Sequence, residues 1–160
     1  MVVNNADTGL DKSLFDENSD AAEKINAVID TNFTRLVHCT RKTVRLMRKS
    51  NNHGLIVNIG TSIFDENQSN VYFPSKASVN GFSKIIRQES IFYKYENIHV
   101  TNMCPSYLIN PEGFDEGYIG KNEQHLNPQN IHDVLETSNN INVAELGIKY
   151  VAETFFLIFF

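Results

Sequence analysis

Short apolar runs alternate with long amphipathic stretches along the first two thirds of the chain, and this alternation limits its fold more than any other feature. The apolar runs at residues 1–3, 55–59 and 98–104 have the length of buried strands. Residues 20–49 and 74–93 repeat apolar side chains at helical spacing. Strands that alternate with helices build parallel β-α-β units with right-handed crossovers. The sequence therefore predicts an α/β fold with a doubly wound parallel sheet.

Each of the two expected helices carries an apolar stripe. In the first, the stripe consists of Ile25, Val28, Ile29, Phe33, Leu36, Val37, Val44 and Met47. In the second, it consists of Ala77, Phe82, Ile85, Ile86 and Phe92. The rest of the first helix is basic near its end, with Arg35, Arg41, Lys42, Arg45, Arg48 and Lys49. This basic run indicates either a phosphate-binding stripe or, in better accord with the acidic total, a solvated face whose cations complement the helix dipole.

The length and the charge of the chain limit its class. Its 160 residues suffice for one domain with a buried core, and its net charge of −5 predicts neither nucleic acid nor an anionic membrane as partner. Cys39 and Cys104 are far apart, so no disulfide framework is expected. The five histidines form no zinc-binding pattern, so no metal is expected. No signal peptide is visible, and we expect a cytoplasmic protein.

The last third of the chain has weaker patterns. Residues 106–142 are rich in Asn, Glu, Gly and Pro, and are expected to form a long loop with short helical pieces such as residues 127–135. After Thr154 the chain ends in six apolar residues, too few for a bilayer, which needs about 20. We expect residues 148–160 to form a terminal strand or an altered apolar tail.

The pair Tyr72 and Lys76 stands at the start of the second expected helix. Residues four apart lie on the same helix face. An ammonium beside a phenol favours the phenolate and lowers the tyrosine pKa from its usual value near 10. Such a tyrosine can give or take a proton while a hydride moves to or from a neighbouring carbon. The Tyr-x-x-x-Lys spacing alone is a weak signal, because both residues are common on surfaces.

Three companions strengthen this interpretation. Thr61 and Ser62 follow the strand at residues 55–59, at the edge where open α/β sheets bind ligands. Asn32 lies inside a helix, where asparagine is a poor helix former unless its side chain or a freed backbone group holds a water. Asn4-Asn5-Ala6 follows the first strand at the same edge. Each also has a structural alternative: a loop or cap, a kink on a polar face, and a turn, respectively.

Together these elements resemble the short-chain dehydrogenase/reductase family over residues 1–147. The family's Asn-Asn-Ala-Gly element is similar to Asn4-Asn5-Ala6-Asp7, and its Tyr-x-x-Ser-Lys element to residues 72–76. Its helical asparagine is matched by Asn32, its strand and serine by residues 54–61 with Thr61, and its Pro-Gly by Pro105-Ser106. Residues 126–131 look most like the farnesol dehydrogenase-like or dehydrogenase/reductase member 11-like branch. Members of this branch use NADP(H) on alcohols and ketones, including isoprenoids and steroids.

The resemblance implies a Rossmann-like sheet and a set of roles. Tyr72 would be the general acid/base, with Lys76 lowering its pKa and holding the nicotinamide ribose. Thr61 would bind the substrate oxygen, with Ser62 as its alternative. Asn32 would position a water of the proton relay. The further cofactor-binding residues would be Asn4, Ala6 and Pro105.

The chain also departs from the family pattern. The opening strand, the Gly-rich turn that holds the pyrophosphate and the residue that selects NADP over NAD have no counterpart in it. Asp7 stands where the family has glycine, which places a carboxylate near the path of an anionic cofactor. Ser106 likewise replaces a glycine, and the interval from Thr61 to Tyr72 is about two residues shorter than usual in the family.

Two hypotheses therefore stand at this point. The first is an oxidoreductase that uses NADP, with NAD as the alternative, on a small-molecule alcohol or ketone, and whose full product is longer than this chain. The second is a catalytically silent remnant that keeps a dimerisation surface. The resemblance implies a homodimer or homotetramer, formed by the helices at residues 23–49 and 74–93 packing as a four-helix bundle.

Overall fold

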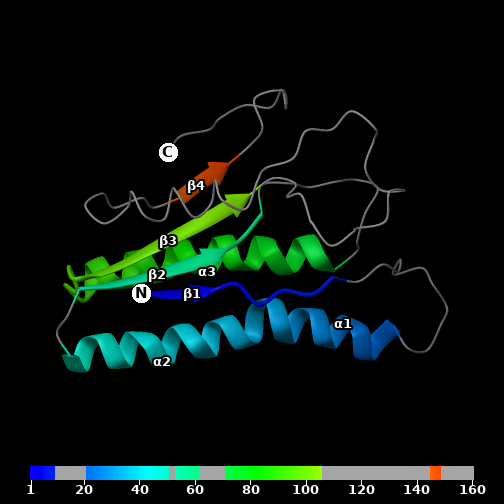
Figure 1. Cartoon of the computed structure of the whole chain (residues 1–160), viewed down its shortest axis with the longest axis horizontal. Coiled ribbons are helices and arrows are strands. Elements are labelled where there is room, and N and C mark those ends of the chain that lie inside the picture. Colours follow the sequence, from blue (N-terminus) through cyan, green and yellow to red (C-terminus); the bar gives the residue numbers. More distant parts are fainter. Residues whose placement is uncertain (10–20, 51–52, 62–70, 106–144, 149–160) are drawn as a thin grey trace.

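The computed structural model describes residues 1–9, 21–50, 53–61, 71–105 and 145–148. In chain order the elements are β1 (Val2–Asn4), α1 (Ala21–Ile29), η1 (Asp30–Thr34), α2 (Arg35–Ser50), β2 (Gly54–Ile59), α3 (Tyr72–Phe92), β3 (Ile98–Pro105) and β4 (Glu145–Ile148). The four strands form one sheet in the order β1-β2-β3-β4, and every neighbouring pair is parallel (Figure 1). The expected α/β, Rossmann-like class is confirmed.

Both long helical segments pack on the same face of this sheet. Val44 and Met47 of α2 and Ile86 of α3 contact a buried cluster formed by the strand residues Ile56, Ile98 and Val100. Figure 1 shows α1 and α2 joined into one long rod below the strands. The rings of Phe33 in η1 and Phe82 in α3 meet edge to face at 6.0 Å. The packing thus brings the middle of the rod against α3.

A row of asparagines crosses the sheet on the helix-covered face. The strand register aligns Asn4, Asn58 and Asn102. Asn4 donates hydrogen bonds to the side-chain oxygens of Asn58 (2.8 Å) and Thr40 (3.1 Å). Asn58 donates to Ser83 (2.9 Å), whose hydroxyl also lies 3.5 Å from the side-chain oxygen of Asn102. This asparagine row satisfies polar groups that would otherwise be costly to bury.

The buried face of α3 differs from the expected one. Its buried residues are Ser75, Lys76, Val79 and Ser83, whereas Ile85 is 52% exposed and Phe92 78% exposed. The expected apolar stripe was therefore wrong for Ile85 and Phe92, although Ile86 packs against the core cluster, because the strands opposite α3 present amides that pair with small polar side chains. In the first helical segment Val28 and Leu36 are buried as expected, but Ile29 is 41% exposed.

The strand β4 was not expected from the sequence. It pairs with the end of β3, with Asn102 aligned to Glu145 and Pro105 to Ile148. The helical pieces expected at residues 127–135 and the tail at 149–160 lie outside the described residues, as does Ser62.

Candidate active site

The carboxyl ends of β1 and β2 and the first turn of α3 bring most of the candidate residues together. Asp7 and Thr8 follow β1, Thr61 follows β2, and Tyr72 opens α3. In parallel α/β sheets ligands bind at this edge, outside the carboxyl ends of the strands. The edge is therefore the candidate active site.

Tyr72, Lys76 and Asp7 form its central group. The Tyr72 hydroxyl donates a hydrogen bond to Asp7 Oδ2 at 2.8 Å. Lys76 Nζ lies 3.2 Å from Asp7 Oδ1 and donates to the carbonyl oxygen of Ile59 at 3.1 Å. The same ammonium is 5.9 Å from the centroid of the Tyr72 ring. The expected pairing of Tyr72 with Lys76 on one helix face is present, and Asp7 bridges the two.

The electrostatics of Tyr72 differ from the expectation. Burial raises the pKa of Tyr72 above its usual range, and the negative charge of Asp7 and its hydrogen bond to the hydroxyl raise this pKa further. The lowering expected from Lys76 is not seen in this arrangement, because the ammonium pairs with the carboxylate that holds the phenol proton. In this state Tyr72 is a neutral phenol.

Asn32 is 2% exposed and lies in η1, a short stretch of π-helix between α1 and α2. Its Oδ1 accepts from the backbone N–H of Thr8 at 2.9 Å, and its Nδ2 donates to the Thr8 carbonyl at 2.9 Å. Nδ2 also donates to the Ser75 hydroxyl at 3.0 Å, and that hydroxyl donates to the Tyr72 carbonyl at 2.6 Å. The side chain of Asn32 thus ties the segment after β1 to the first turn of α3.

Thr61 is 7% exposed, and its carbonyl oxygen accepts a hydrogen bond from the Asn80 side chain at 3.2 Å. The preceding residue, Gly60, lies so close to Asn80 that a Cβ there would collide with the Asn80 amide oxygen. The Asn102 side chain donates to that same oxygen at 3.1 Å. Asn80 therefore links the end of β2 to the asparagine row.

The remaining candidates lie at the same edge but in different surroundings. The side-chain amide of Asn4 is used within the asparagine row, as its bonds to Asn58 and Thr40 show. Ala6 is exposed, and Pro105 is buried at the end of β3. A contact of these three residues with a cofactor stays a prediction.

Three residues of the site were not singled out from the sequence: Thr8, Ser75 and Asn80. Ser75 falls inside the Tyr-x-x-Ser-Lys element, so its place in that motif was the available signal. Asn80 lies four residues beyond Lys76, on the same face of α3, and this spacing could have identified it. Thr8 takes part through its backbone, which no side-chain pattern reveals.

The family whose sequence model is described as short chain dehydrogenase matches residues 1–112, well over half of the chain. The chain belongs to this family. The farnesol dehydrogenase of Aedes aegypti is 33% identical to it over 162 residues, which cover 97% of the chain and 65% of that relative. The expected family and its farnesol dehydrogenase-like branch are thus supported. The chain spans a little under two thirds of the length of that relative.

Solved structures agree with this assignment. The closed form of serine dehydrogenase complexed with NADP+ is 25% identical, with a TM-score of 0.75 over 99% of this chain and 68% of that one. A short chain dehydrogenase from Leptospira borgpetersenii with bound NAD+ is 20% identical, with a TM-score of 0.76 over 92% of this chain and 63% of that one. The second likeness supports the fold alone.

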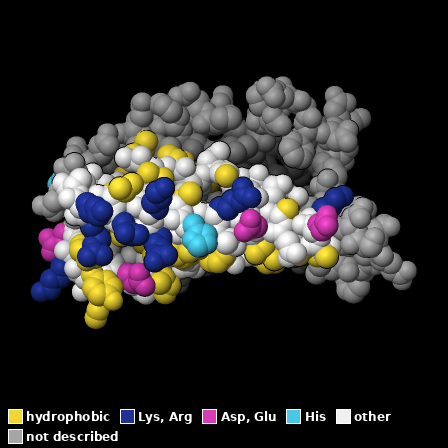
Figure 2. Space-filling view, turned by 90° about the horizontal axis from the view of Figure 1, so that it is seen from below, with side chains coloured by type: hydrophobic (Ala, Val, Ile, Leu, Met, Phe, Trp, Pro, Cys, Tyr) yellow, Lys and Arg dark blue, Asp and Glu magenta, His cyan; other side chains and the backbone are white. Residues whose placement is uncertain are grey.

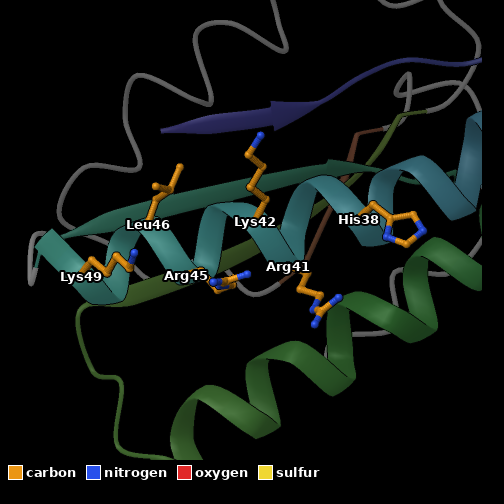
Figure 3. A pocket seen from close by; sticks show the side chains of 6 residues that line it. All are labelled: His38, Arg41, Lys42, Arg45, Leu46 and Lys49. Carbon is orange, nitrogen blue, oxygen red and sulfur yellow. The ribbon is translucent and has the colours of Figure 1, made fainter.

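The basic run of α2 lies apart from the candidate active site. It surrounds an open crevice of about 360 Å³ lined by His38, Arg41, Lys42, Arg45, Leu46 and Lys49. Figure 2 shows the Lys and Arg side chains gathered on one face of the molecule, and Figure 3 shows the lining residues along the outer side of α2. The exposure of these cations fits the expected solvated face.

Two further properties concern the part of the chain that the structure describes. No described helix is both long and apolar enough to cross a membrane. Within the same residues, no three His, Cys, Asp or Glu side chains group closely enough to hold a metal ion.

Proposed function

We propose that this chain carries the catalytic residues of an NAD(P)(H)-dependent oxidoreductase that interconverts an alcohol and a ketone. The observation that carries the proposal is the meeting of Tyr72 and Lys76 at the carboxyl end of β2, where Lys76 also binds the Ile59 carbonyl. Membership of the short-chain dehydrogenase family supports the same reaction class.

The proposed proton chemistry follows from these residues. In alcohol oxidation, Tyr72 accepts the substrate hydroxyl proton as the carbon–hydrogen bond breaks, and in ketone reduction it returns that proton to the carbonyl oxygen. The Thr61 hydroxyl orients the substrate oxygen. Lys76 stabilises the phenolate form of Tyr72 once its ammonium faces the phenol rather than Asp7.

Asn32 is proposed to position the water of the proton relay through its backbone. Its side chain is already bonded to Thr8 and Ser75, which leaves a backbone group as the water partner. The π-helical turn supports this role, because it breaks the regular helical hydrogen-bond pattern at this point, and such turns are frequent at functional sites.

The donors at the site suit the nicotinamide end of a dinucleotide. Lys76 and Tyr72 are hydrogen-bond donors that fit the ribose hydroxyls, and the dinucleotide supplies the hydride acceptor or donor when it is bound. Asn4, Ala6 and Pro105 are proposed to line its path along the strand ends. The structural relatives contain NADP+ in one case and NAD+ in another, and we propose NADP with NAD as the alternative.

The proposed substrate is an alcohol or ketone of the isoprenoid or steroid class. The Aedes aegypti relative is named for farnesol, which is an isoprenoid alcohol. A panel of farnesol, a hydroxysteroid and a short secondary alcohol separates these classes when each is tested with NADP+ and with NAD+.

Tyr72→Phe tests the proposed reaction directly. The variant keeps the ring but loses the proton-carrying hydroxyl, so we expect turnover to fall at least a hundredfold, the lower end of what general acid–base catalysis contributes (about 10²–10⁴-fold). Turnover is followed as the appearance of reduced nicotinamide. Tyr93→Phe is the matched control, because Tyr93 is 60% exposed at the far end of α3. Wild-type turnover in Tyr72→Phe rejects the proposed role.

A second candidate function is a catalytically silent dehydrogenase-like protein that only associates with itself. The contact of Asp7 with both Tyr72 and Lys76 favours it, as does the exposure of Leu46 (60%) on α2 and Ile85 (52%) on α3. Titration of the folded chain with NADPH, followed by nucleotide fluorescence, separates the two candidates. Saturable micromolar binding supports the oxidoreductase, and a dimeric mass in solution without any binding supports the silent protein.

A further inference from the structure

Asp7 is the one acidic side chain that contacts both members of the catalytic pair among the described residues. Its Oδ2 accepts a hydrogen bond from the Tyr72 hydroxyl at 2.8 Å, and its Oδ1 lies 3.2 Å from Lys76 Nζ. The Asp7 side chain is 36% exposed, whereas that of Lys76 is 4% exposed. The carboxylate thus lies between the buried ammonium and solvent.

This contact uses the donors that the proposed reaction needs. A phenol has a single O–H group that can donate a hydrogen bond. In this state Tyr72 directs it to Asp7 rather than to a substrate oxygen. Lys76 directs its ammonium to Asp7 and to the Ile59 carbonyl, so a ribose hydroxyl has to compete with a charged acceptor. Asp7 therefore opposes both substrate and cofactor contacts at the same two atoms.

The charges around Tyr72 also favour its protonated form. Among the described residues, the charged groups in contact with it are Asp7, from the segment after β1, and Lys76, from its own helix. The polar residues that tie this turn to η1 and β1, namely Asn32, Ser75 and Thr8, carry no charge. The positive charge of Lys76 is compensated by Asp7. Ionisation of Tyr72 would therefore place a second negative charge next to the carboxylate, which is unfavourable.

We propose that Asp7 is a positioning residue that keeps Tyr72 in its protonated form and holds Lys76 away from the nicotinamide ribose. This inference rests on the proposed function and adds the control of its working pH. While the contact is closed, the site takes up protons from an alcohol only at alkaline pH. When Asp7 turns away, the ammonium faces the phenol and the working pH falls toward neutral.

Two variants of Asp7 test this proposal in the full chain without cofactor. Asp7→Asn removes the charge but keeps an oxygen that can accept from Tyr72, and Asp7→Gly removes both. Carbon-13 NMR of labelled tyrosine follows ionisation, and the missing signal in Tyr72→Phe assigns the Tyr72 resonance. We expect wild-type Tyr72 to remain protonated at about pH 11, one unit above the usual tyrosine pKa. Its midpoint should fall in Asp7→Asn, and further in Asp7→Gly, by about one pH unit or more.

NADPH binding gives a second readout. We expect Asp7→Gly to bind NADPH about tenfold more tightly than wild type, the effect of freeing one charge-assisted hydrogen bond. Glu89→Gln is the matched control, since it removes one exposed carboxylate from α3 away from the site, and it should change neither the Tyr72 midpoint nor NADPH binding.

The outcomes separate this proposal from the proposed function. An unchanged Tyr72 midpoint in both folded Asp7 variants overturns the role of Asp7, whatever the activity. If Asp7→Gly does not fold, Asp7→Asn carries the same test, because it preserves the shape of the side chain. A lowered midpoint in a protein whose turnover survives Tyr72→Phe supports the role of Asp7 and rejects the proposed reaction.

Discussion

Lys76 is 3% exposed, and a buried ammonium needs oxygen partners nearby. In the part of the chain that the structure describes, it has two, the carbonyl oxygen of Ile59 and the carboxylate of Asp7. Its face on α3 could be predicted from its spacing to Tyr72. The contact of Tyr72 with Asp7 could not, because the two are 65 residues apart in the sequence and only the fold brings them together. The sequence motif identified Tyr72 and Lys76, but the protonation state of Tyr72 depends on Asp7, which lies in a segment far away in the sequence.

The hydrogen bonds of the Asn32 side chain are expected to stabilise the fold. Asn32→Ala removes three hydrogen bonds and leaves the N–H and C=O of Thr8 without their partner. We expect the free energy of unfolding to fall by about 2 kcal/mol, as for other buried polar groups that lose a partner. Urea unfolding followed by far-ultraviolet circular dichroism measures this loss.

Asn26→Ala is the control for that measurement. Asn26 lies on α1 and is exposed, so alanine there changes little beyond helix propensity, and we expect a change within about 0.5 kcal/mol. Equal effects of the two substitutions would show that the side chain of Asn32 does not hold the segment after β1 to α3.

Among the elements, α3 shows where periodicity fails. The sequence predicts its extent within about two residues, but only part of its apolar stripe faces the core, since Ile85 and Phe92 are exposed. Ser75, Val79 and Ser83 recur every four residues on that face, and two of them are small and polar. Their hydroxyls bond within the helix and to Asn32 and Asn58, so burial here follows hydrogen bonding rather than hydrophobicity.

The close packing of Gly60, after β2, against Asn80 of α3 can be tested by substitution. A methyl group at Gly60 would collide with the side-chain oxygen of Asn80. The side-chain nitrogen of the same residue donates a hydrogen bond to the carbonyl oxygen of Thr61. We expect Gly60→Ala to lower the free energy of unfolding by about 1–3 kcal/mol, as overpacking does. In the double variant with Asn80→Ala the collision is removed, so the two losses should not add.

Gly81→Ala is the matched substitution for this test. Gly81 is exposed in the middle of α3, and a methyl group there meets no atom within 4 Å. Alanine should therefore stabilise the helix by up to about 1 kcal/mol. A Gly60→Ala variant as stable as Gly81→Ala, or additive losses in the double variant, would contradict the close contact between β2 and α3.

For the molecule as a whole, the three strands with strong apolar runs and the helices between them were predictable from local patterns. The pairing of β4 with β3 was not, because Glu145–Ile148 is a short strand that follows β3 only after a separation of about 40 residues. Short strands of mixed polarity depend on non-local pairing for their stability, so little in their own sequence marks them. The domain boundary placed at residue 147 stays a prediction.

The raised pKa of Tyr72 predicts how the stability of the whole chain depends on pH. Below about pH 10 the phenol is protonated in both the folded and the unfolded chain, so its contribution is fully present. Above about pH 10 the unfolded chain loses this proton while the folded chain keeps it. The free energy of unfolding therefore falls as pH rises.

Urea unfolding at about pH 8 and at about pH 10.5 measures this effect, on either side of the usual tyrosine pKa. We expect a smaller decrease in Tyr72→Phe than in wild type, because the variant has no proton to lose at this position. Tyr93→Phe, which alters an exposed ring, should decrease as wild type does. Identical decreases in all three proteins would indicate that Tyr72 ionises freely in the folded state.

The asparagine row also favours one register of the strands over its alternatives. A strand shifted by one residue turns its asparagine to the opposite face, away from Ser83 and from the neighbouring amides. The misaligned chain would then bury amides without hydrogen-bond partners, at a cost of about 1–3 kcal/mol for each such group. The register that pairs these asparagines is therefore also the register that places the carboxyl ends of β1 and β2 side by side, next to the first turn of α3.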